Sequence, residues 1–238
     1  MRSRPTLVML PGTLCDARIF QHQRRALRDV ADVRALNYQA LDRTGAWLDR
    51  LLDQLPEHFS LAGFSLGGLW AMELLRRAPL RVQRLALIAS NARPASTHAR
   101  RRSAAQWRAW QREGPAAVAQ RAKPAYFHHP RQLRCHAPLV HDMAVRTSRQ
   151  DTKAELDWVA SRPDSLATLR SFAGALLLVS GAQDRLCPPA WQREMLRAQP
   201  EARWLELPRV GHFVPLEAPT HLSAALRLWM LSQADSIE

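Results

Sequence analysis

Short, unbroken apolar runs recur along both ends of the chain, and polar or amphipathic stretches separate them. A brief run of this kind, stopped by Pro, Gly or Ser, is typical of a parallel strand buried on both faces. The pattern predicts strands at 6–10 (TLVML), 33–36, 59–64 (FSLAGF), 84–89 (RLALIA), 175–180 (ALLLVS) and 203–207. We therefore expect a sheet of about six strands.

Stretches with helical periodicity fill the gaps between these runs. Asp16 is suited to cap a helix that continues through residue 26, and Pro79 ends a helix that starts at residue 66. Further helices are predicted at about 44–55, 189–198 and 219–231. Regular alternation of strand and helix implies right-handed crossovers, so we expect an α/β fold with a mostly parallel sheet and helices on both faces.

The alternation stops between residues 95 and 170, a charged stretch with a helical pattern that is rich in Trp and His. Gly114-Pro115 and four further prolines, among them Pro138, interrupt this stretch, and it contains no buried strand pattern. We therefore expect a helical cap at 95–170, inserted into a core made of residues 1–94 and 171–238.

Composition places the chain among globular proteins. Of its 238 residues, 47% are hydrophobic and 23% are charged, which argues against a disordered or fibrous protein. The sequence shows no secretory leader pattern and no apolar stretch long enough to cross a membrane. Three cysteines, an odd and sparse set, do not suggest a disulfide framework, so a cytoplasmic location is expected.

The formal net charge of +13 is unevenly distributed. Residues 95–170 carry fourteen Arg or Lys against six acidic residues, so the excess is concentrated in the predicted cap. Either these side chains form an ordinary solvated helix surface, or they attract an anion such as an acidic carrier protein or a carboxylate-bearing substrate. The sequence shows no nucleic-acid recognition motif, so nucleic acid is not an expected partner.

The candidate nucleophile directly follows the apolar run at 59–64. The sequence GFSLG at 63–67 fits the pattern G-x-S-x-G, in which a strand ends in a sharp turn that lifts a serine above the sheet. The two glycines would let strand and helix approach closely around Ser65. An ordinary glycine-rich turn fits the same five residues, so the interpretation depends on the rest of the chain.

A serine hydroxyl needs a base within hydrogen-bond reach and a group that orients this base. Asp184 follows the run at 175–180, and His212 follows the run at 203–207. In a parallel sheet these loops leave from the same carboxyl edge as Ser65, so three residues distant in sequence become neighbours. The sequence thus predicts a catalytic triad of Ser65, His212 and Asp184, in a chain order that this type of sheet allows.

These motifs resemble those of the α/β-hydrolase superfamily. Residues 63–68 resemble its nucleophile elbow, 181–188 (GAQDRLCP) its acid loop, and 211–219 (GHFVPLEAP) its C-terminal segment with histidine and glutamate. The resemblance extends from about residue 6 to residue 232 and has the family's variable cap at 95–170. It implies an oxyanion hole formed by the backbone N–H groups of Thr13 and Leu66, although Pro11 stands where many relatives carry His.

The resemblance includes small serine carboxylesterases, among them esterases that process pimeloyl-carrier methyl esters. It implies hydrolysis of a small-molecule ester through an acyl-enzyme, without a metal or an organic cofactor. The same triad also serves hydrolases of carrier-linked esters or thioesters, lactonases and hydrolases of carbon–carbon bonds, so these alternatives stay open. A ligand receptor on a hydrolase fold is the non-enzymatic alternative. The patterns do not indicate an oligomeric state.

Several apolar residues near the predicted site are candidates for a substrate pocket. Leu14 and Phe213 neighbour the predicted oxyanion-hole residue and base, while Trp110, Tyr126 and Phe127 lie in the predicted cap. The cap aromatics could shape an acyl or aryl site, attach the cap to the core, or both. No metal site is expected at the cap histidines, because no Cys or carboxylate accompanies them in a ligand pattern; these are His128, His129, His136 and His141.

Overall fold

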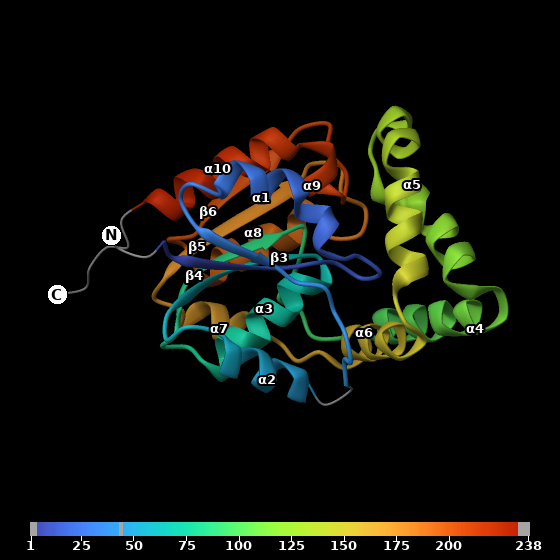
Figure 1. The fold of residues 1–238 in the computed structure, drawn as a ribbon, viewed down its shortest axis with the longest axis horizontal. Helices are drawn as coiled ribbons and strands as arrows, with labels where there is room; N and C mark the ends of the chain where they lie inside the picture. The colour runs from blue at the N-terminus through green and yellow to red at the C-terminus, as the bar shows by residue number, and fades with distance from the viewer. Residues whose placement is uncertain (1–3, 43–44, 233–238) are drawn as a thin grey trace.

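Six parallel strands form one sheet in the computed structural model, which describes residues 4–42 and 45–232 (Figure 1). They are β1 (Thr6–Leu10), β2 (Asp32–Ala35), β3 (Phe59–Phe64), β4 (Val82–Ile88), β5 (Ala175–Gly181) and β6 (Arg203–Leu207), in the spatial order β2-β1-β3-β4-β5-β6. The predicted parallel sheet of six strands is confirmed. Because β2 and β3 lie on opposite sides of β1, the loops after β1 and β3 border the topological switch point, where α/β sheets bind ligands.

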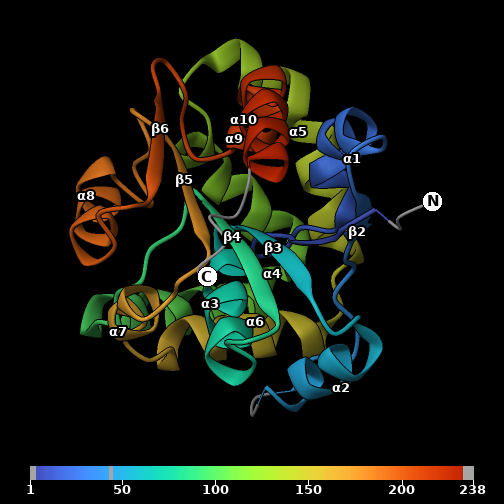
Figure 2. The ribbon, with the colours of Figure 1, turned by 90° about the vertical axis from the view of Figure 1, so that its left-hand side faces the viewer.

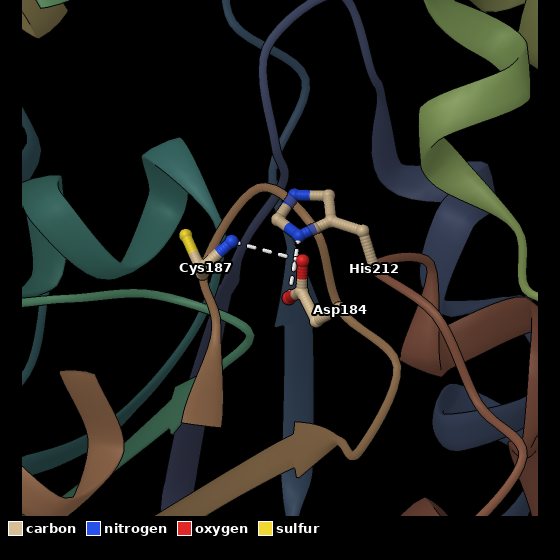
Figure 3. A group of neighbouring side chains, drawn as sticks. All are labelled: Asp184, Cys187 and His212. Carbon is tan, nitrogen blue, oxygen red and sulfur yellow. Dashed lines mark hydrogen bonds and ion pairs between the residues drawn. The ribbon is translucent and has the colours of Figure 1, made fainter. Parts of the chain in front are cut away.

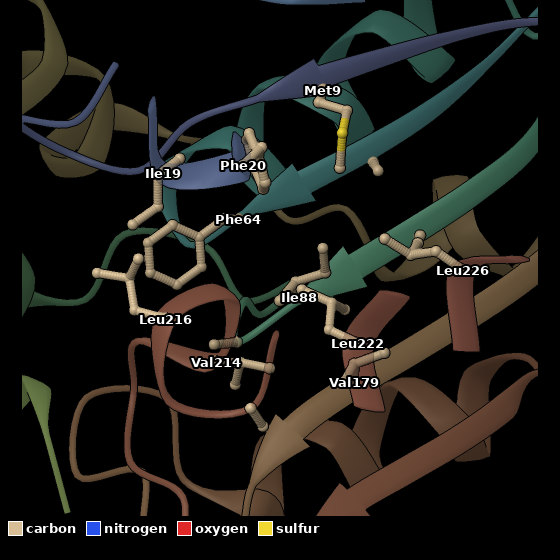
Figure 4. Close-up of a cluster of buried hydrophobic side chains, with 14 of the residues drawn as sticks. Met9, Ile19, Phe20, Phe64, Ile88, Val179, Val214, Leu216, Leu222 and Leu226 are labelled. Carbon is tan, nitrogen blue, oxygen red and sulfur yellow. The ribbon is translucent and has the colours of Figure 1, made fainter. Parts of the chain in front are cut away.

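Alternate residues of the central strands enter two separate apolar cores. On β1, Leu7 and Met9 belong to one core and Val8 and Leu10 to the other, and all four are fully buried. Figure 4 shows Met9 in the first core, with side chains from β3, β4, β5 and the C-terminal helix. A strand buried on both faces must be apolar at nearly every position, which explains the unbroken runs in the sequence.

Helices cover both faces of the sheet (Figures 1 and 2). The core that contains Met9 is covered by a 3₁₀ helix (Ala17–Phe20), α1 (Gln21–Leu27), α9 (Val214–Glu217) and α10 (Pro219–Leu231). The opposite core is covered by α2 (Ala46–Gln54), α3 (Leu66–Arg77), α7 (Leu166–Arg170) and α8 (Pro189–Ala198). This arrangement is the α/β-hydrolase architecture that the sequence predicted.

Three further helices lie between β4 and β5 in the chain and stand to one side of the sheet, on the right of Figure 1. They are α4 (Thr97–Tyr126), α5 (Pro130–Arg146) and α6 (Arg149–Ser161), named together the α4–α6 segment. Gly114 leaves the helical conformation, with φ 78° and ψ 173°, and kinks α4 where a breaker was predicted. Pro138, also expected to interrupt a helix, lies inside α5, which continues through it.

Some boundaries differ from the predictions. Asp16 caps a 3₁₀ turn rather than an α-helix, and α1 starts only at Gln21. The helices α7 and α9 are too short for periodicity to reveal, and α7 packs in the core under α3 although it falls within the range 95–170. Residues 1–3 and 233–238 of the predicted core, and the first residue of the predicted helix 44–55, lie outside the described residues.

The described helices were compared with the requirements for a membrane-spanning helix. Among the described residues, no helix combines the length and the apolar character that a bilayer crossing requires.

Candidate active site

Ser65 occupies a sharp turn between β3 and α3. Its backbone adopts φ 53° and ψ −112°, a strained conformation that persists only where the surrounding structure holds it. Hydrogen bonds do so from two sides: the Ser65 N–H donates to the Ile88 carbonyl at 2.9 Å, and the Ser90 hydroxyl donates to the Ser65 carbonyl at 2.8 Å. The serine therefore stands in the kind of strand-to-helix turn that its sequence pattern indicated.

Two glycines allow β1, β3 and α3 to approach this closely. A Cβ atom on Gly67 would lie 1.9 Å from the carbonyl oxygen of Leu10, and one on Gly63 would lie 2.3 Å from the carbonyl oxygen of Gly67. Both contacts are with backbone atoms, which cannot yield unless a strand or a helix moves. The close packing around Ser65 thus requires glycine at positions 63 and 67.

Ser65, His212 and Asp184 form a continuous chain of side-chain hydrogen bonds. Nε2 of His212 lies 2.9 Å from Oγ of Ser65, and Nδ1 lies 2.8 Å from Oδ2 of Asp184. Figure 3 shows the second of these contacts, between the loops that follow β6 and β5. His212 and Asp184 are each 3% exposed, whereas Ser65 is half-buried and borders a cavity. The structure brings these three residues together from three separate loops.

Backbone donors and the imidazole favour the charged form of Asp184. The N–H groups of Leu186 and Cys187 donate to its Oδ1 at 2.8 Å and 2.9 Å. Burial alone would raise the pKa of Asp184, but the charge and hydrogen bond of His212, together with these two donors, hold the pKa below its usual value. An ionised carboxylate at Nδ1 can orient the ring of His212 and stabilise its protonated form.

Glu217 organises the loop that carries His212. Its carboxylate accepts the N–H of Gly211 at 3.0 Å and the N–H of His128 at 2.8 Å, and the Tyr126 carbonyl accepts the N–H of His212 at 2.9 Å. Burial raises the pKa of Glu217, although the backbone donors oppose this shift. The C-terminal end of α4 and the His212 loop are therefore joined by several hydrogen bonds.

Asp184, Cys187 and His212 also lie close enough to be considered as metal ligands, with candidate ligand atoms within 4.8 Å of one another (Figure 3). The arrangement suits a hydrogen-bonded pair better, because Nδ1 of His212 and Oδ2 of Asp184 already bond to each other. Burial raises the pKa of the Cys187 thiol, which disfavours the thiolate that a metal would need. Within the described residues, His128, His129, His136 and His141 are not part of any such group.

The two residues predicted to form the oxyanion hole lie beside Ser65. Thr13 and Leu66 both line a cavity that also contains Ser65 and His212. Leu66 is the first residue of α3, where backbone N–H groups lack an acceptor within the helix and the helix dipole favours negative charge. Thr13 lies in the loop after β1, across the topological switch point from Ser65. The role of these two N–H groups stays a prediction.

Two cavities border Ser65, with volumes of about 310 Å³ and about 60 Å³. The larger cavity extends towards Leu69, Arg162 and Trp191, and the smaller one towards Tyr126 and Phe213. A volume of about 310 Å³ is at the lower end of the range for ligand pockets, so the site suits a small molecule or one end of a larger one. Both cavities share the lining residues Thr13, Ser65, Arg102, Val159, Leu186 and His212.

The five residues predicted to contact substrate are found in two kinds of place. Tyr126 and Phe213 line the smaller cavity. Leu14 and Trp110 instead lie in an apolar cluster with residues of α4 and α5, and Phe127 stacks against Phe213 and His136. Leu14, Trp110 and Phe127 do not line either cavity beside Ser65 among the residues described there. Their contacts attach the α4–α6 segment to the core.

No pattern in the sequence indicated Glu155, a fully buried carboxylate on α6. Its Oε2 accepts the N–H of Leu14 at 2.9 Å, which bonds α6 to the loop that carries Thr13. Burial raises the pKa of Glu155 to about 8; the Leu14 N–H opposes this shift and the nearby Asp151 adds to it. A single acidic residue in a helical stretch carries no motif, so only the tertiary contact reveals it.

Arg102 was also overlooked as an individual residue. In the sequence analysis Arg102 contributed only to the net charge of residues 95–170. In the structure Arg102 lines both cavities beside Ser65. Helical periodicity could have placed Arg102 on one face of α4. It could not have indicated which face meets the sheet.

The chain belongs to a family of hydrolases. Its sequence matches the alpha/beta hydrolase family over residues 7–226, and it is a member of that family. It is 33% identical over 99 residues to the biotin biosynthesis bifunctional protein BioHC of Cellvibrio japonicus, and 50% identical over 46 residues to the pimeloyl-[acyl-carrier protein] methyl ester esterase of Aromatoleum aromaticum. These matches cover 38% and 19% of this chain, and only 20% and 18% of the two relatives.

Solved structures resemble the fold over nearly the whole chain. An esterase from Thermogutta terrifontis, described with malate bound, superposes with a TM-score of 0.85 at 24% identity, covering 96% of this chain and 90% of the esterase. The enol-lactonase from Burkholderia xenovorans LB400 gives a TM-score of 0.84 at 21% identity, covering 97% and 93%. At these identities the similarity establishes the fold, and function must be argued from the site.

Proposed function

We propose that the protein hydrolyses carboxylic esters through an acyl-enzyme intermediate, with Ser65 as nucleophile. The observation that carries this proposal is the hydrogen-bond chain from Ser65 Oγ through His212 to Asp184, with contacts of 2.9 Å and 2.8 Å. A buried imidazole held between a hydroxyl and an ionised carboxylate is the arrangement that activates serine in unrelated hydrolases. We also propose that the protein acts in the cytoplasm, in keeping with its odd and sparse set of cysteines.

In the proposed mechanism, Oγ of Ser65 attacks the ester carbonyl while Nε2 of His212 takes the hydroxyl proton. The negative charge that develops on the carbonyl oxygen is stabilised by the backbone N–H groups of Thr13 and Leu66. When the tetrahedral intermediate collapses, His212 returns the proton to the leaving alcohol. A water molecule then repeats the attack on the acyl-serine, and His212 again acts first as base and then as acid, which releases the carboxylic acid and free Ser65.

The decisive test is hydrolysis of short p-nitrophenyl esters by the Ser65→Ala variant. We expect activity to fall by roughly 10³-fold or more with the fold retained, and a fluorophosphonate probe to label the wild-type protein at Ser65 only. Ser171→Ala is the matched control, because it removes an exposed hydroxyl that directly follows α7 and is distant from Ser65 in the sequence. This variant should keep full activity. Unchanged ester hydrolysis by Ser65→Ala would rule out the proposed role.

A second candidate is an ester or thioester linked to an acidic carrier protein. The excess of positive charge in residues 95–170 favours it, as do the names of the two partly matching relatives. In this proposal residues 95–170 act as a cap whose exposed arginines dock the carrier. Raising the salt concentration should then lower kcat/KM for a carrier-linked methyl ester but leave kcat/KM for a free ester unchanged, because screening weakens contacts between exposed charges.

Charge reversal at the α4–α6 segment sharpens this test. Arg131→Glu and Arg134→Glu, both exposed on α5, should weaken action on the carrier-linked ester, whereas Arg24→Glu on α1 should not. Equal effects of all three variants would exclude docking on this segment. Lactones and carbon–carbon bond substrates belong in the same assay panel, since one of the similar structures is an enol-lactonase.

A further inference from the structure

One arginine of the α4–α6 segment, exposed to solvent, borders the space beside the predicted nucleophile. Arg102 lies on the first half of α4, before the kink at Gly114, and lines both cavities that contain Ser65 and His212. A guanidinium is protonated at every pH at which proteins are folded, so this space carries a fixed positive charge. Such a charge beside a reactive serine needs a chemical explanation.

The positive charge has no acidic counterpart in the cavity walls. Among the described residues that line the two cavities, none is Asp or Glu, and their ionisable members besides Arg102 are His98, Arg162, Cys187, Tyr126 and His212. Asp184 lies behind His212 and is bonded to that ring. The lining of the two cavities thus contains two arginines and, among the described residues, no carboxylate.

A second guanidinium, that of Arg162, stands at the same cavity in a fixed position. Its Nε donates to the Arg93 carbonyl at 3.0 Å, and its Nη1 donates to the Val159 carbonyl at 2.5 Å. Burial lowers the pKa of Arg162; Cys187 opposes this shift and the like charge of Arg102 adds to it. Because Arg102 and Arg162 both line the larger cavity, an anion that enters it meets two positive charges.

We propose that Arg102, with Arg162 beside it, binds a carboxylate carried by the substrate, so that the enzyme acts on small esters that bear a negative charge. This inference rests on the proposed function and adds the substrate class. The planar fork of a guanidinium matches the two oxygens of a carboxylate, and such charge-assisted pairs are stronger than hydrogen bonds between neutral groups. The cavity of about 310 Å³ accommodates a short chain between this group and the ester carbonyl at Ser65.

The test compares two esters of similar length, mono-p-nitrophenyl adipate and p-nitrophenyl heptanoate, of which only the first ends in a carboxylate. We expect wild-type protein to favour the adipate, mainly through a lower KM. Arg102→Gln should reduce the ratio of the two kcat/KM values by roughly ten-fold or more, the loss expected for a charge-assisted hydrogen bond. Arg108→Gln removes the same charge from another exposed position on α4, which is not among the residues that line the two cavities, and should leave the ratio unchanged.

Two outcomes would overturn the inference: no preference of the wild-type protein for the adipate, or an equal change of the ratio in Arg102→Gln and Arg108→Gln. If neither ester is hydrolysed, the proposed function fails. The carboxylate site is then tested independently, by measuring the binding of adipate. Titration calorimetry of adipate into the Ser65→Ala protein should then give a measurable affinity that Arg102→Gln abolishes. Equal binding by both proteins, or binding by neither, contradicts the carboxylate site.

Discussion

The carboxyl edge of the sheet and the α4–α6 segment each contain a buried carboxylate, yet the two carboxylates differ in charge. Asp184 and Glu155 both accept backbone N–H groups. Asp184 also faces the imidazole of His212, and its pKa is lowered, whereas the nearby charged group for Glu155 is another acid, Asp151, and burial raises the pKa to about 8. Burial dominates at Glu155, whereas at Asp184 the imidazole of His212 and the backbone donors together outweigh the effect of burial.

We expect the sheet edge and the α4–α6 segment to have different roles in the reaction. The sheet edge holds the residues that we propose for bond cleavage, in the loops that follow β3, β5 and β6. The α4–α6 segment contributes Arg102 and Tyr126 to the cavity walls and bonds to the edge at two places, through Glu155 and through the Tyr126 carbonyl. We expect changes at the edge to abolish reaction with every ester, and changes in the segment to alter stability or the choice of ester.

The largest expected effect is that of Asp184→Asn. The amide keeps an acceptor for the N–H groups of Leu186 and Cys187 but cannot stabilise a protonated His212, so kcat should fall by roughly 10³-fold or more on all esters. Steady-state kinetics with a short p-nitrophenyl ester measures this loss. Asp53→Asn, at an exposed position on α2, is the control. A loss confined to one ester would contradict a purely chemical role for the edge.

The same substitution at two glycines compares the two regions directly. Gly67→Ala creates a Cβ contact of 1.9 Å with the Leu10 carbonyl oxygen and should lower the free energy of unfolding by about 3 kcal/mol or more, with loss of activity. Gly114→Ala meets no atom within 4 Å and suffers only from its positive φ of 78°, at a cost of about 1 to 2 kcal/mol. Urea unfolding checks both values. If both variants lost similar amounts of unfolding free energy, the close backbone packing around Ser65 would not be what requires glycine at position 67.

Glu155 gives a prediction for the pH dependence of stability. Its carboxyl keeps a proton up to about pH 8 in the folded protein but loses it near its ordinary pKa of 4.5 when unfolded. Because the folded state binds more protons in this interval, the contribution of Glu155 to stability is present at low pH and is lost as pH rises towards 8. Wild-type protein should therefore lose stability relative to Glu155→Gln between pH 5 and pH 8.5.

Urea unfolding of both proteins at the two pH values measures this difference, and contributions of other titrating groups cancel in the comparison. Glu57→Gln, at an exposed position between α2 and β3, should show no such trend. A constant difference between wild type and Glu155→Gln across the interval would mean that Glu155 is ionised throughout.

The smallest expected effect concerns the start of α6. Ser148 caps this helix, since its Oγ accepts the N–H of Asp151 at 3.0 Å. Ser148→Ala should lower the free energy of unfolding by about 1 kcal/mol and leave kcat/KM for a neutral ester within a factor of about two. Ser148→Asn, which retains a capping side chain, should recover most of the stability. A drop in kcat without a loss of stability would show that α6 positions the reacting groups.

The sequence predicted the strands well because a strand buried on both faces has a distinctive composition. Each central run became a strand within a residue or two, and GFSLG became the turn at Ser65. The helix predicted after Asp16 begins as a 3₁₀ helix, and the short α7 was not predicted, because fewer than two turns leave no periodicity. Pro138 was expected to break a helix, but α5 tolerates it.

The sequence by itself determined the order of strands and helices, the strained turn at Ser65 and the loops that carry Asp184 and His212, because short-range patterns and turn chemistry encode these features. Only the tertiary structure decided that Arg102 borders the cavity, that Leu14 and Trp110 pack away from it, and that Glu155 meets the Leu14 N–H. These contacts depend on how α4 and α6 rotate against the sheet. That rotation is set by packing over the whole surface of contact, which local sequence patterns do not record.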